Sequence, residues 1–288
     1  MSQGHQHVPA PGTAPALHGV PQTFVVSLLA RHLASSGPDP VISDPAASVL
    51  LGGLGLSRLG GDWSFGAVVA AAAVRTAILD AAVRSFAEAS RHPTLVTIGA
   101  GLCTRCVRLR DLDADWIDID LPGVAALRSA LLPPAPNRIV LGESALDSGW
   151  RDQVAAIDGP RLFVLEGLTM YLEEDAVRDL VTGLADRCPG SHLLVDTTGP
   201  PHRPPGRYRQ LSHVCGAESQ FRWGVRDLSE LAAWHHRLHL VETWHLMDYH
   251  PAAWPLPLRA LRRIPSVRAQ AKIGHFHVTA AAPGSQPS

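Results

Sequence analysis

The chain has 288 residues, 46% of them hydrophobic and 18% charged, and its formal net charge is −1. This composition is typical of a soluble globular protein that can bury a full core. A net charge so close to zero argues against nucleic acid or an anionic membrane as a partner. Four cysteines without an export signal favour reduced thiols and a cytoplasmic location.

The two ends of the chain differ in composition from the rest. Residues 1–18 are rich in Pro, Gly and His, and residues 283–288 read PGSQPS, so we expect a disordered leader and tail around a single domain at 19–282. The leader lacks the basic start and apolar core of a secretory signal. The apolar run at 67–74 is shorter than the roughly 20 residues that a membrane-spanning helix needs.

The first part of the domain, residues 19–90, is predicted to be a helical cover. Apolar positions recur at helical spacing over 22–35, and further helices are expected near 45–56 and 66–90. A proline-rich turn separates the first two of these helices.

Strand and helix patterns alternate after this cover. Strands are predicted at 95–98, 115–119, 138–141, 161–165 and 192–196, and helices near 122–132, 148–157 and 173–187. This alternation predicts an α/β fold with a parallel sheet and helices on both of its faces.

The last part of the domain begins with a long connection. Residues 199–237 are predicted to form a lid or substrate region, because long proline-rich connections are usually functional. We expect a helix at 227–237 within it, followed by two closing strands at 238–244 and 275–279.

The stretch 95–120 carries the strongest functional signal. Its first apolar run ends in Gly99-Ala100-Gly101, and its second ends in Asp120. Glycine lets the backbone approach a ligand closely. Nucleotide-binding α/β units place an acidic acceptor for the ribose hydroxyls about 20 residues after the glycines. The stretch therefore predicts a ligand with a ribose at the carboxyl ends of two neighbouring strands.

The glycine pattern also bears on which nucleotide binds. A dinucleotide fold requires a third glycine, and Thr104 occupies that place, which disfavours a nicotinamide-dependent oxidoreductase. The pattern suits an adenosine ligand without a pyrophosphate, and S-adenosylmethionine is such a ligand. From the spacing alone, an ordinary turn of an α/β fold stays an alternative.

Several further blocks occur in a recognisable order. They are GVPQTFVVSLLARHLASSGPDPVISDPAA (19–47), RTAILD (75–80), GAGLCTRCVRL (99–109), WIDIDLPGV (116–124), VLEGLTMYL (164–172) and FRWGVRD (221–227). Through them the chain resembles the leucine carboxyl methyltransferase family, most closely its bacterial branch of polyketide-type, tetracenomycin-like O-methyltransferases. The resemblance runs from about Gly19 to Phe276.

The resemblance implies a Rossmann-like class I fold for S-adenosylmethionine-dependent methyl transfer. Such a fold has a mostly parallel seven-stranded sheet, an N-terminal helical cover and a lid inserted after the fifth strand. It implies S-adenosylmethionine as the cofactor and a small natural-product carboxylate or phenol as the methyl acceptor. A relative that keeps the fold as a binding module, or for chemistry without the cofactor, is the alternative. The sequence does not indicate an oligomeric state.

The resemblance also implies which residues hold the cofactor. Arg75 would reach its carboxylate, and Glu166 would lie near its amine or sulfonium; a surface arginine and a helix cap are the alternatives. The glycine loop would line the methionine part, Asp120 would accept from the ribose, and two residues would border the adenine. The complete predicted set is Arg75, Gly99, Ala100, Gly101, Asp120, Leu121, Ser144, Ala145, Glu166 and Gly167.

Two neighbouring aspartates are expected to be structural. Asp118 lies on the same strand as Asp120, and its side chain is expected to point to the opposite face. Asp80 is expected to pair with an arginine and hold its helix in place.

Arg31 and Tyr171 are candidates for orienting the acceptor. A solvated helix face is the alternative for Arg31, and core packing is the alternative for Tyr171 and Met170. If the enzyme acts mainly by holding cofactor and acceptor in line, a carboxylate acceptor needs no catalytic base, because it is already ionised at neutral pH. A phenol would require a base, and the histidines available in the lid region are His202, His213, His245 and His250. Tryptophans in the same part of the chain would wall an apolar pocket or pack in the core: Trp223, Trp234, Trp244 and Trp254.

Cys103 departs from the family pattern, which has aspartate at that place, and this change is expected to weaken cofactor binding. Cys103 and Cys106 form a C-x-x-C, but a zinc site would require a second pair, and no metal is predicted.

Overall fold

The computed structural model describes residues 23–36, 40–54, 56, 66–200 and 221–280. The predicted leader, the predicted tail and most of the predicted lid lie outside the described residues.

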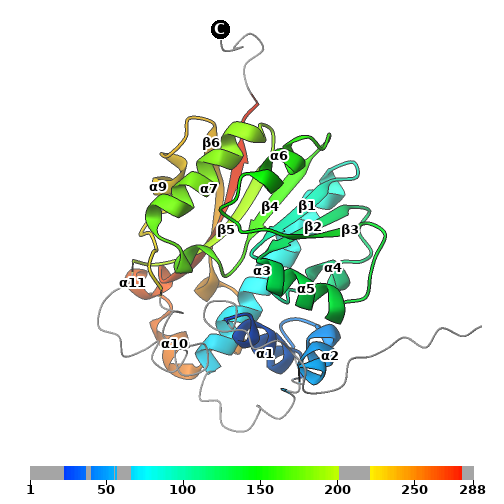
Figure 1. The fold of residues 1–288 in the computed structure, drawn as a ribbon. Coiled ribbons are helices and arrows are strands. Elements are labelled where there is room, and N and C mark those ends of the chain that lie inside the picture. Colours follow the sequence, from blue (N-terminus) through cyan, green and yellow to red (C-terminus); the bar gives the residue numbers. More distant parts are fainter. Residues whose placement is uncertain (1–22, 37–39, 55, 57–65, 201–220, 281–288) are drawn as a thin grey trace, which may run out of the picture.

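Three helices precede the sheet: α1 (Thr23–Ser35), α2 (Pro45–Gly53) and α3 (Gly66–Ala89). Asp44 caps α2 by accepting a hydrogen bond from the Ala47 N–H, and Pro45 occupies the first turn, where a missing N–H costs nothing. Figure 1 shows α1 and α2 together at one end of the sheet. Leu28 and Leu29 of α1 pack there with α2 and with the loop after the first strand.

The sheet has seven strands in the order β3-β2-β1-β4-β5-β7-β6, and β7 is antiparallel to both of its neighbours. The remaining neighbours pair in parallel. This arrangement confirms the predicted Rossmann-like methyltransferase fold. The strands are β1 (Thr94–Ile98), β2 (Asp115–Asp120), β3 (Arg138–Gly142), β4 (Arg161–Leu165), β5 (His192–Thr198), β6 (Leu238–His245) and β7 (Ala271–Val278).

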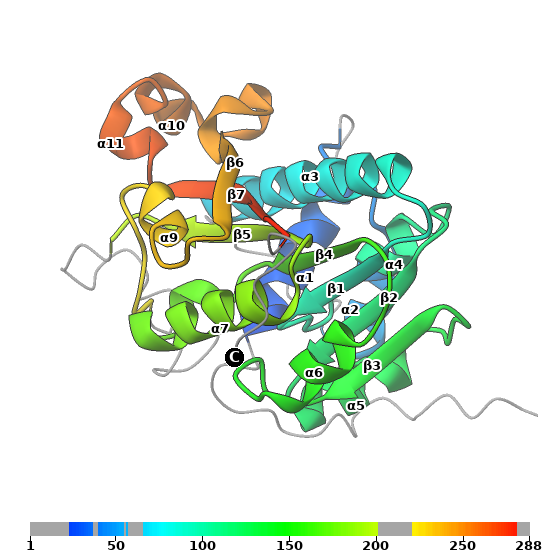
Figure 2. The same ribbon diagram turned by 90° about the horizontal axis from the view of Figure 1, so that it is seen from above.

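Helices cover both faces of this sheet: in Figure 2, α3 crosses one face, and α6 (Gly149–Ala155) and α7 (Glu174–Arg187) cover the other. Helix α5 (Pro122–Leu131) lies on the α3 face, because its Arg128 pairs with Asp118, which shares a face of β2 with Trp116. Along β1, Val96 and Ile98 pack toward α6 and α7, whereas Leu95 packs toward α3, because strand side chains alternate between the faces. The remaining elements are α4 (Arg105–Arg108), η2 (Thr169–Tyr171), α9 (Ser229–Ala232), η3 (Leu246–Asp248), η4 (Pro251–Ala253), α10 (Leu256–Leu261) and α11 (Pro265–Arg268).

Two predicted elements in the last part of the chain were wrong in extent. The helix expected at 227–237 is only the short α9, because the chain turns after Ala232 and enters β6. The last strand begins at Ala271 rather than 275. Lys272 lies near the start of this strand, and its buried ammonium donates to the carbonyls of Val225 and Ala269. The first residues of the strand therefore do not show the apolar pattern by which strands were predicted.

Helix α3 is long and apolar enough to cross a membrane by length and composition. The prediction considered only the shorter run at 67–74. Core residues of α3, among them Val74, Leu79 and Val83, pack against the sheet, and such packing by itself makes a helix apolar.

Candidate functional site

A cavity of about 360 Å³ lies over the carboxyl ends of β1, β2 and β4 and under α1. The strand order reverses between β1 and β4, and open α/β sheets bind ligands at such a switch point. The structure brings every predicted site residue to this one cavity: Arg31, Arg75, Gly99, Ala100, Gly101, Asp120, Leu121, Ser144, Ala145, Glu166, Gly167 and Tyr171.

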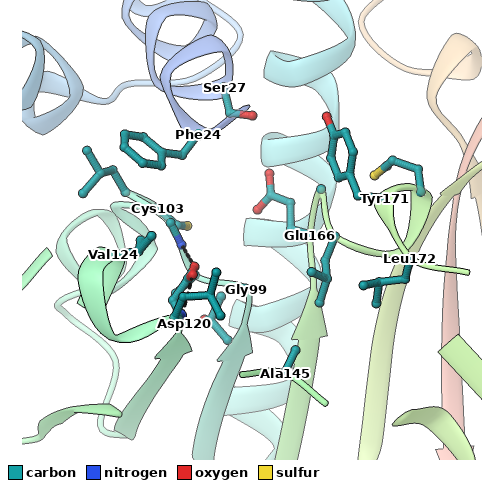
Figure 3. Close-up of a pocket in the computed structure, with 18 of the residues that line it drawn as sticks. Phe24, Ser27, Gly99, Cys103, Asp120, Val124, Ala145, Glu166, Tyr171 and Leu172 are labelled. Atoms are coloured by element: carbon teal, nitrogen blue, oxygen red, sulfur yellow. Dashed lines mark hydrogen bonds between the residues drawn. The ribbon is translucent and has the colours of Figure 1, made fainter. Parts of the chain in front are cut away.

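The glycine loop after β1 is shaped by left-handed backbone and by Asp120. Gly99 and Gly101 have φ of +68° and +48°, which favours glycine at both places. A Cβ on Gly101 would come within 3.0 Å of the Phe24 side chain. One Asp120 oxygen accepts from the Gly101 N–H at 2.7 Å and the other from the Leu121 N–H at 2.8 Å (Figure 3). Each oxygen keeps a further lone pair for a ligand hydroxyl.

Burial raises the pKa of Asp120, and the two backbone N–H groups oppose that shift. Among the described residues no cation forms an ion pair with Asp120, so its carboxylate oxygens are available as acceptors for hydroxyl groups.

Glu166 stands between two guanidinium groups. Oε1 accepts from Arg75 Nε at 3.1 Å, and Oε2 accepts from Arg105 Nη2 at 2.6 Å. Burial alone would raise the pKa of Glu166, but Arg105 and Arg75 hold it well below its usual range, so the side chain is ionised. The alternative of a helix cap is wrong, because the following helix begins at Thr169 with Leu168 as its N-cap residue, and both Glu166 oxygens accept from arginines.

Arg75 reaches the cavity from α3, and the alternative of a surface arginine is wrong. Its Nε donates to Glu166, its Nη1 donates to Asp196 Oδ2 at 2.9 Å, and its Nη2 lies 3.5 Å from Ser27 Oγ. The guanidinium is thus held along two directions, and Nη2 is the nitrogen with the weakest protein contact.

These contacts belong to a continuous chain of alternating charges. Four arginines and four acids alternate in it, and the nitrogen–oxygen distance between neighbours is 2.6 to 3.2 Å. Their order is Arg31, Asp44, Arg108, Asp80, Arg105, Glu166, Arg75 and Asp196. The chain is neutral in sum, so a zwitterionic ligand can enter without leaving an uncompensated charge.

The predicted structural role of Asp80 is confirmed, since it accepts from both Arg105 and Arg108. Asp118 is structural as predicted, because its carboxylate pairs with the buried Arg128 at 2.6 Å. The expectation that its side chain points to the opposite face from Asp120 was wrong, because residues two apart on a strand lie on the same face. Asp118 lies further from the strand end than Asp120 and outside the cavity lining.

Arg31 is not on a solvated face. Its Nε donates to Asp44 at 2.9 Å and its Nη2 to the Leu102 carbonyl at 2.8 Å, and only 4% of its side chain is exposed. These bonds join α1 to the start of α2 and to the glycine loop. A contact from Arg31 to an acceptor stays a prediction.

The end of the cavity away from Asp120 is apolar. Tyr171 and Phe221 meet there edge to face, with ring centroids 5.3 Å apart. Figure 3 shows Tyr171 and Leu172 on one side of Glu166, and Phe24 and Cys103 on the other. Met170 also lines the cavity, so this wall can hold a flat apolar molecule.

Other predicted candidates lie elsewhere. His245 and His250 do not line the cavity, and His250 instead contacts a separate groove against α3. His202 and His213 lie outside the described residues. The tryptophans pack in the apolar clusters of the two sheet faces rather than in the cavity wall: Trp223, Trp234, Trp244 and Trp254. Within the described ranges, no three His, Cys, Asp or Glu side chains are arranged to hold a metal ion.

Two charged residues of the site were missed by the sequence analysis, Arg105 and Asp196. Asp196 is a buried acid that directly follows the apolar run 193–195 of β5, and an acid in that place is a signal that could have identified it. Arg105 follows the glycine loop directly, and nothing in its immediate sequence indicates that it is 1% exposed.

The residues present fit S-adenosylmethionine. Left-handed glycines leave the backbone open to the cavity, Asp120 offers acceptors for two hydroxyls, and Arg75 and Glu166 offer opposite charges for a carboxylate and an amine.

The profile of the leucine carboxyl methyltransferase family matches residues 24–185. The tetracenomycin polyketide synthesis O-methyltransferase TcmP of Streptomyces glaucescens is 30% identical over 270 residues, which is 88% of this chain and 94% of that protein. The S-adenosyl-L-methionine-dependent methyltransferase dpfgK of Gibberella zeae is 31% identical over 182 residues, which is 57% of this chain and 60% of that protein. Among solved structures, an O-methyltransferase family protein from Burkholderia thailandensis aligns with a TM-score of 0.46 and 14% identity, over 78% of this chain and 63% of that one.

Proposed function

The chain belongs to the leucine carboxyl methyltransferase family and is an S-adenosylmethionine-dependent O-methyltransferase, and we propose that it methylates a carboxylate or phenolic oxygen of a small polyketide-like molecule. The observation that carries the proposal is the single cavity that joins the Asp120 and Arg75 side to an apolar aromatic end. The free thiols of Cys103, Cys106 and Cys188 accord with a cytoplasmic location, which we include in the proposal.

In this proposal the glycine loop, Asp120 and Leu121 hold the ribose, and Ser144 and Ala145 border the adenine. Arg75 pairs with the methionine carboxylate, and Glu166 faces the amine. Glu166 is ionised in the folded protein, so it can accept from an ammonium group. When bound, S-adenosylmethionine supplies a methyl group that its sulfonium sulfur already activates.

The apolar end of the cavity would place the acceptor. Tyr171 and Phe221 offer aromatic surface at a fixed angle, and Phe24 faces them from α1. The protein contributes mainly by orienting the acceptor oxygen and excluding water, and orientation alone can lower a barrier by several kcal/mol. A carboxylate acceptor needs no base, whereas a phenol must lose its proton to one.

Two measurements test this proposal. Isothermal titration with S-adenosylmethionine should show binding at one site per chain, and the absence of measurable binding would overturn it. A mass-spectrometric screen with a labelled methyl donor should then show a gain of one methyl on an aromatic acid or a phenol. Asp120→Ala serves as the control that loses the signal. Methylation confined to nitrogen or carbon acceptors would contradict the predicted oxygen chemistry.

A further inference from the structure

Asp196 lies at the end of β5, next to the cavity but outside its lining. Its side chain is 4% exposed, and among the residues that the structure describes each carboxylate oxygen has one partner. Oδ2 accepts from Arg75 Nη1 at 2.9 Å, and Oδ1 accepts from the Gly167 N–H at 2.9 Å. One carboxylate therefore connects α3 to the loop that follows β4.

The two partners of Asp196 lie against each other in the cavity wall. Gly167 has a φ of +66°, and a Cβ built on it would lie 3.5 Å from Arg75 Nη2. The backbone of Gly167 and the guanidinium edge of Arg75 are thus adjacent. Asp196 accepts hydrogen bonds from both and lies outside the cavity lining.

Asp196 and Glu166 hold Arg75 in different ways. Glu166 shares its charge between Arg75 and Arg105, whereas within the described part of the chain Arg75 is the only arginine in contact with Asp196. With Nε on Glu166 and Nη1 on Asp196, the guanidinium cannot rotate, and Nη2 stays turned toward Ser27 across the cavity.

We propose that Asp196 is a positioning residue for the cofactor: it holds Arg75 so that Nη2 meets the methionine carboxylate. This inference rests on the proposed role of Arg75 in binding that carboxylate. Asp196 itself would touch neither the cofactor nor the acceptor, because it acts through Arg75 and Gly167.

The test compares two ligands that differ at the amino-acid end. S-adenosylhomocysteine has the carboxylate and amine, whereas 5′-methylthioadenosine has only the nucleoside part. Asp196→Asn keeps an oxygen for the Gly167 N–H but turns an amide N–H toward Arg75. By isothermal titration, Asp196→Asn should weaken S-adenosylhomocysteine roughly tenfold and leave 5′-methylthioadenosine within about twofold.

Two further variants make the result specific. Arg75→Gln should weaken S-adenosylhomocysteine by itself, and adding Asp196→Asn to it should weaken binding no further. Thr169→Val is the matched control: it removes the 2.7 Å hydrogen bond to the Asp196 carbonyl at the same junction and leaves the carboxylate in place. It should not change the ratio of the two affinities.

The outcomes separate the two proposals. If the unchanged protein binds neither nucleoside, the proposed function fails. If it binds both, and Asp196→Asn weakens both equally or neither, the role of Asp196 is refuted. Should Asp196→Asn not fold by circular dichroism, Asp196→Glu, which keeps the charge but displaces it, is held to the same criterion.

Discussion

The Asp120 carboxylate accepts hydrogen bonds from two backbone N–H groups, those of Gly101 and Leu121. Asp120→Ala removes both bonds together with the acceptors for the ribose hydroxyls. We expect it to weaken S-adenosylhomocysteine and 5′-methylthioadenosine alike, by about 30-fold or more, since two hydrogen bonds to a charged group are lost. Isothermal titration measures both affinities. Unchanged affinity for either nucleoside would remove Asp120 from the site.

Cys103 offers a gain-of-function test at the same loop. Nearby Arg105 is close enough for its charge to interact with that side chain, and within the described chain its buried Nη1 has no hydrogen-bond partner. Cys103→Asp adds an acceptor and a negative charge near the proposed amine site. We expect S-adenosylhomocysteine to bind about three- to tenfold more tightly, measured by isothermal titration. Cys103→Ser is the neutral control, and weaker binding by the aspartate variant would contradict this reasoning.

At the residue scale, predictability from sequence depended on how local the signal is. The glycines and Asp120 lie within one stretch of about 20 residues, so their spacing carries the prediction. Asp196 contacts Arg75 across 121 positions, and Arg105 contacts Glu166 across 61. No local pattern encodes such pairs, because each side chain is charged and by itself resembles a surface residue.

At the element scale, strands with a local apolar pattern were predicted well, whereas a strand that depends on distant partners was not. β1 and β4 are largely apolar and buried between two helix layers, and their residues show it directly. β7 has Lys272 as its second residue, and Gly274 leaves room for the Phe276 ring of its own strand. Where β7 begins is determined by its pairing with β5 and β6, and its own sequence pattern does not show that boundary.

The β5–β7 pair carries a histidine cluster that should make stability depend on pH. His192 faces His277 across the strands with ring centroids 4.6 Å apart, and it shares a 2.8 Å hydrogen bond with His275. Burial, together with the charges of His275 and His277, lowers the pKa of His192 to about 4 from 6.5. Stability from the neutral His192 is therefore fully present above pH 6.5 and is lost progressively as the pH falls from 6.5 to about 4.

Denaturant unfolding at a series of pH values checks this expectation. His192→Phe should remove roughly 1–2 kcal/mol of the pH-dependent loss in unfolding free energy, a figure discounted for the partial exposure of the ring. Phe276→Leu is the control, because Phe276 lies between His275 and His277 but packs on the other face of β7, and its loss should lower the unfolding free energy without changing its pH dependence. An identical profile for His192→Phe would show that the cluster does not titrate as expected.

At the scale of the whole molecule, the charged chain from Arg31 to Asp196 joins segments that the sheet alone does not hold together. Its members come from α1, the start of α2, α3, α4 and the ends of β4 and β5. The N-terminal helices are thus fixed to the strand ends by ion pairs as well as by the apolar cluster around Leu28. Sequence patterning predicted these helices but could not predict which charges join them.

Asp80 is central to this chain, because it accepts from Arg105 at 2.8 Å and from Arg108 at 2.7 Å. Asp80→Asn leaves two buried guanidinium groups short of a counter-charge, so we expect a loss of about 2–3 kcal/mol in unfolding free energy. Asp111→Asn is the matched control, since it breaks an exposed pair with Arg84 of the same helix. Solvent screens that pair, and its loss should leave the denaturation midpoint nearly unchanged. Equal midpoints for the two variants in guanidinium chloride would show that the buried chain does not fix the helical cover.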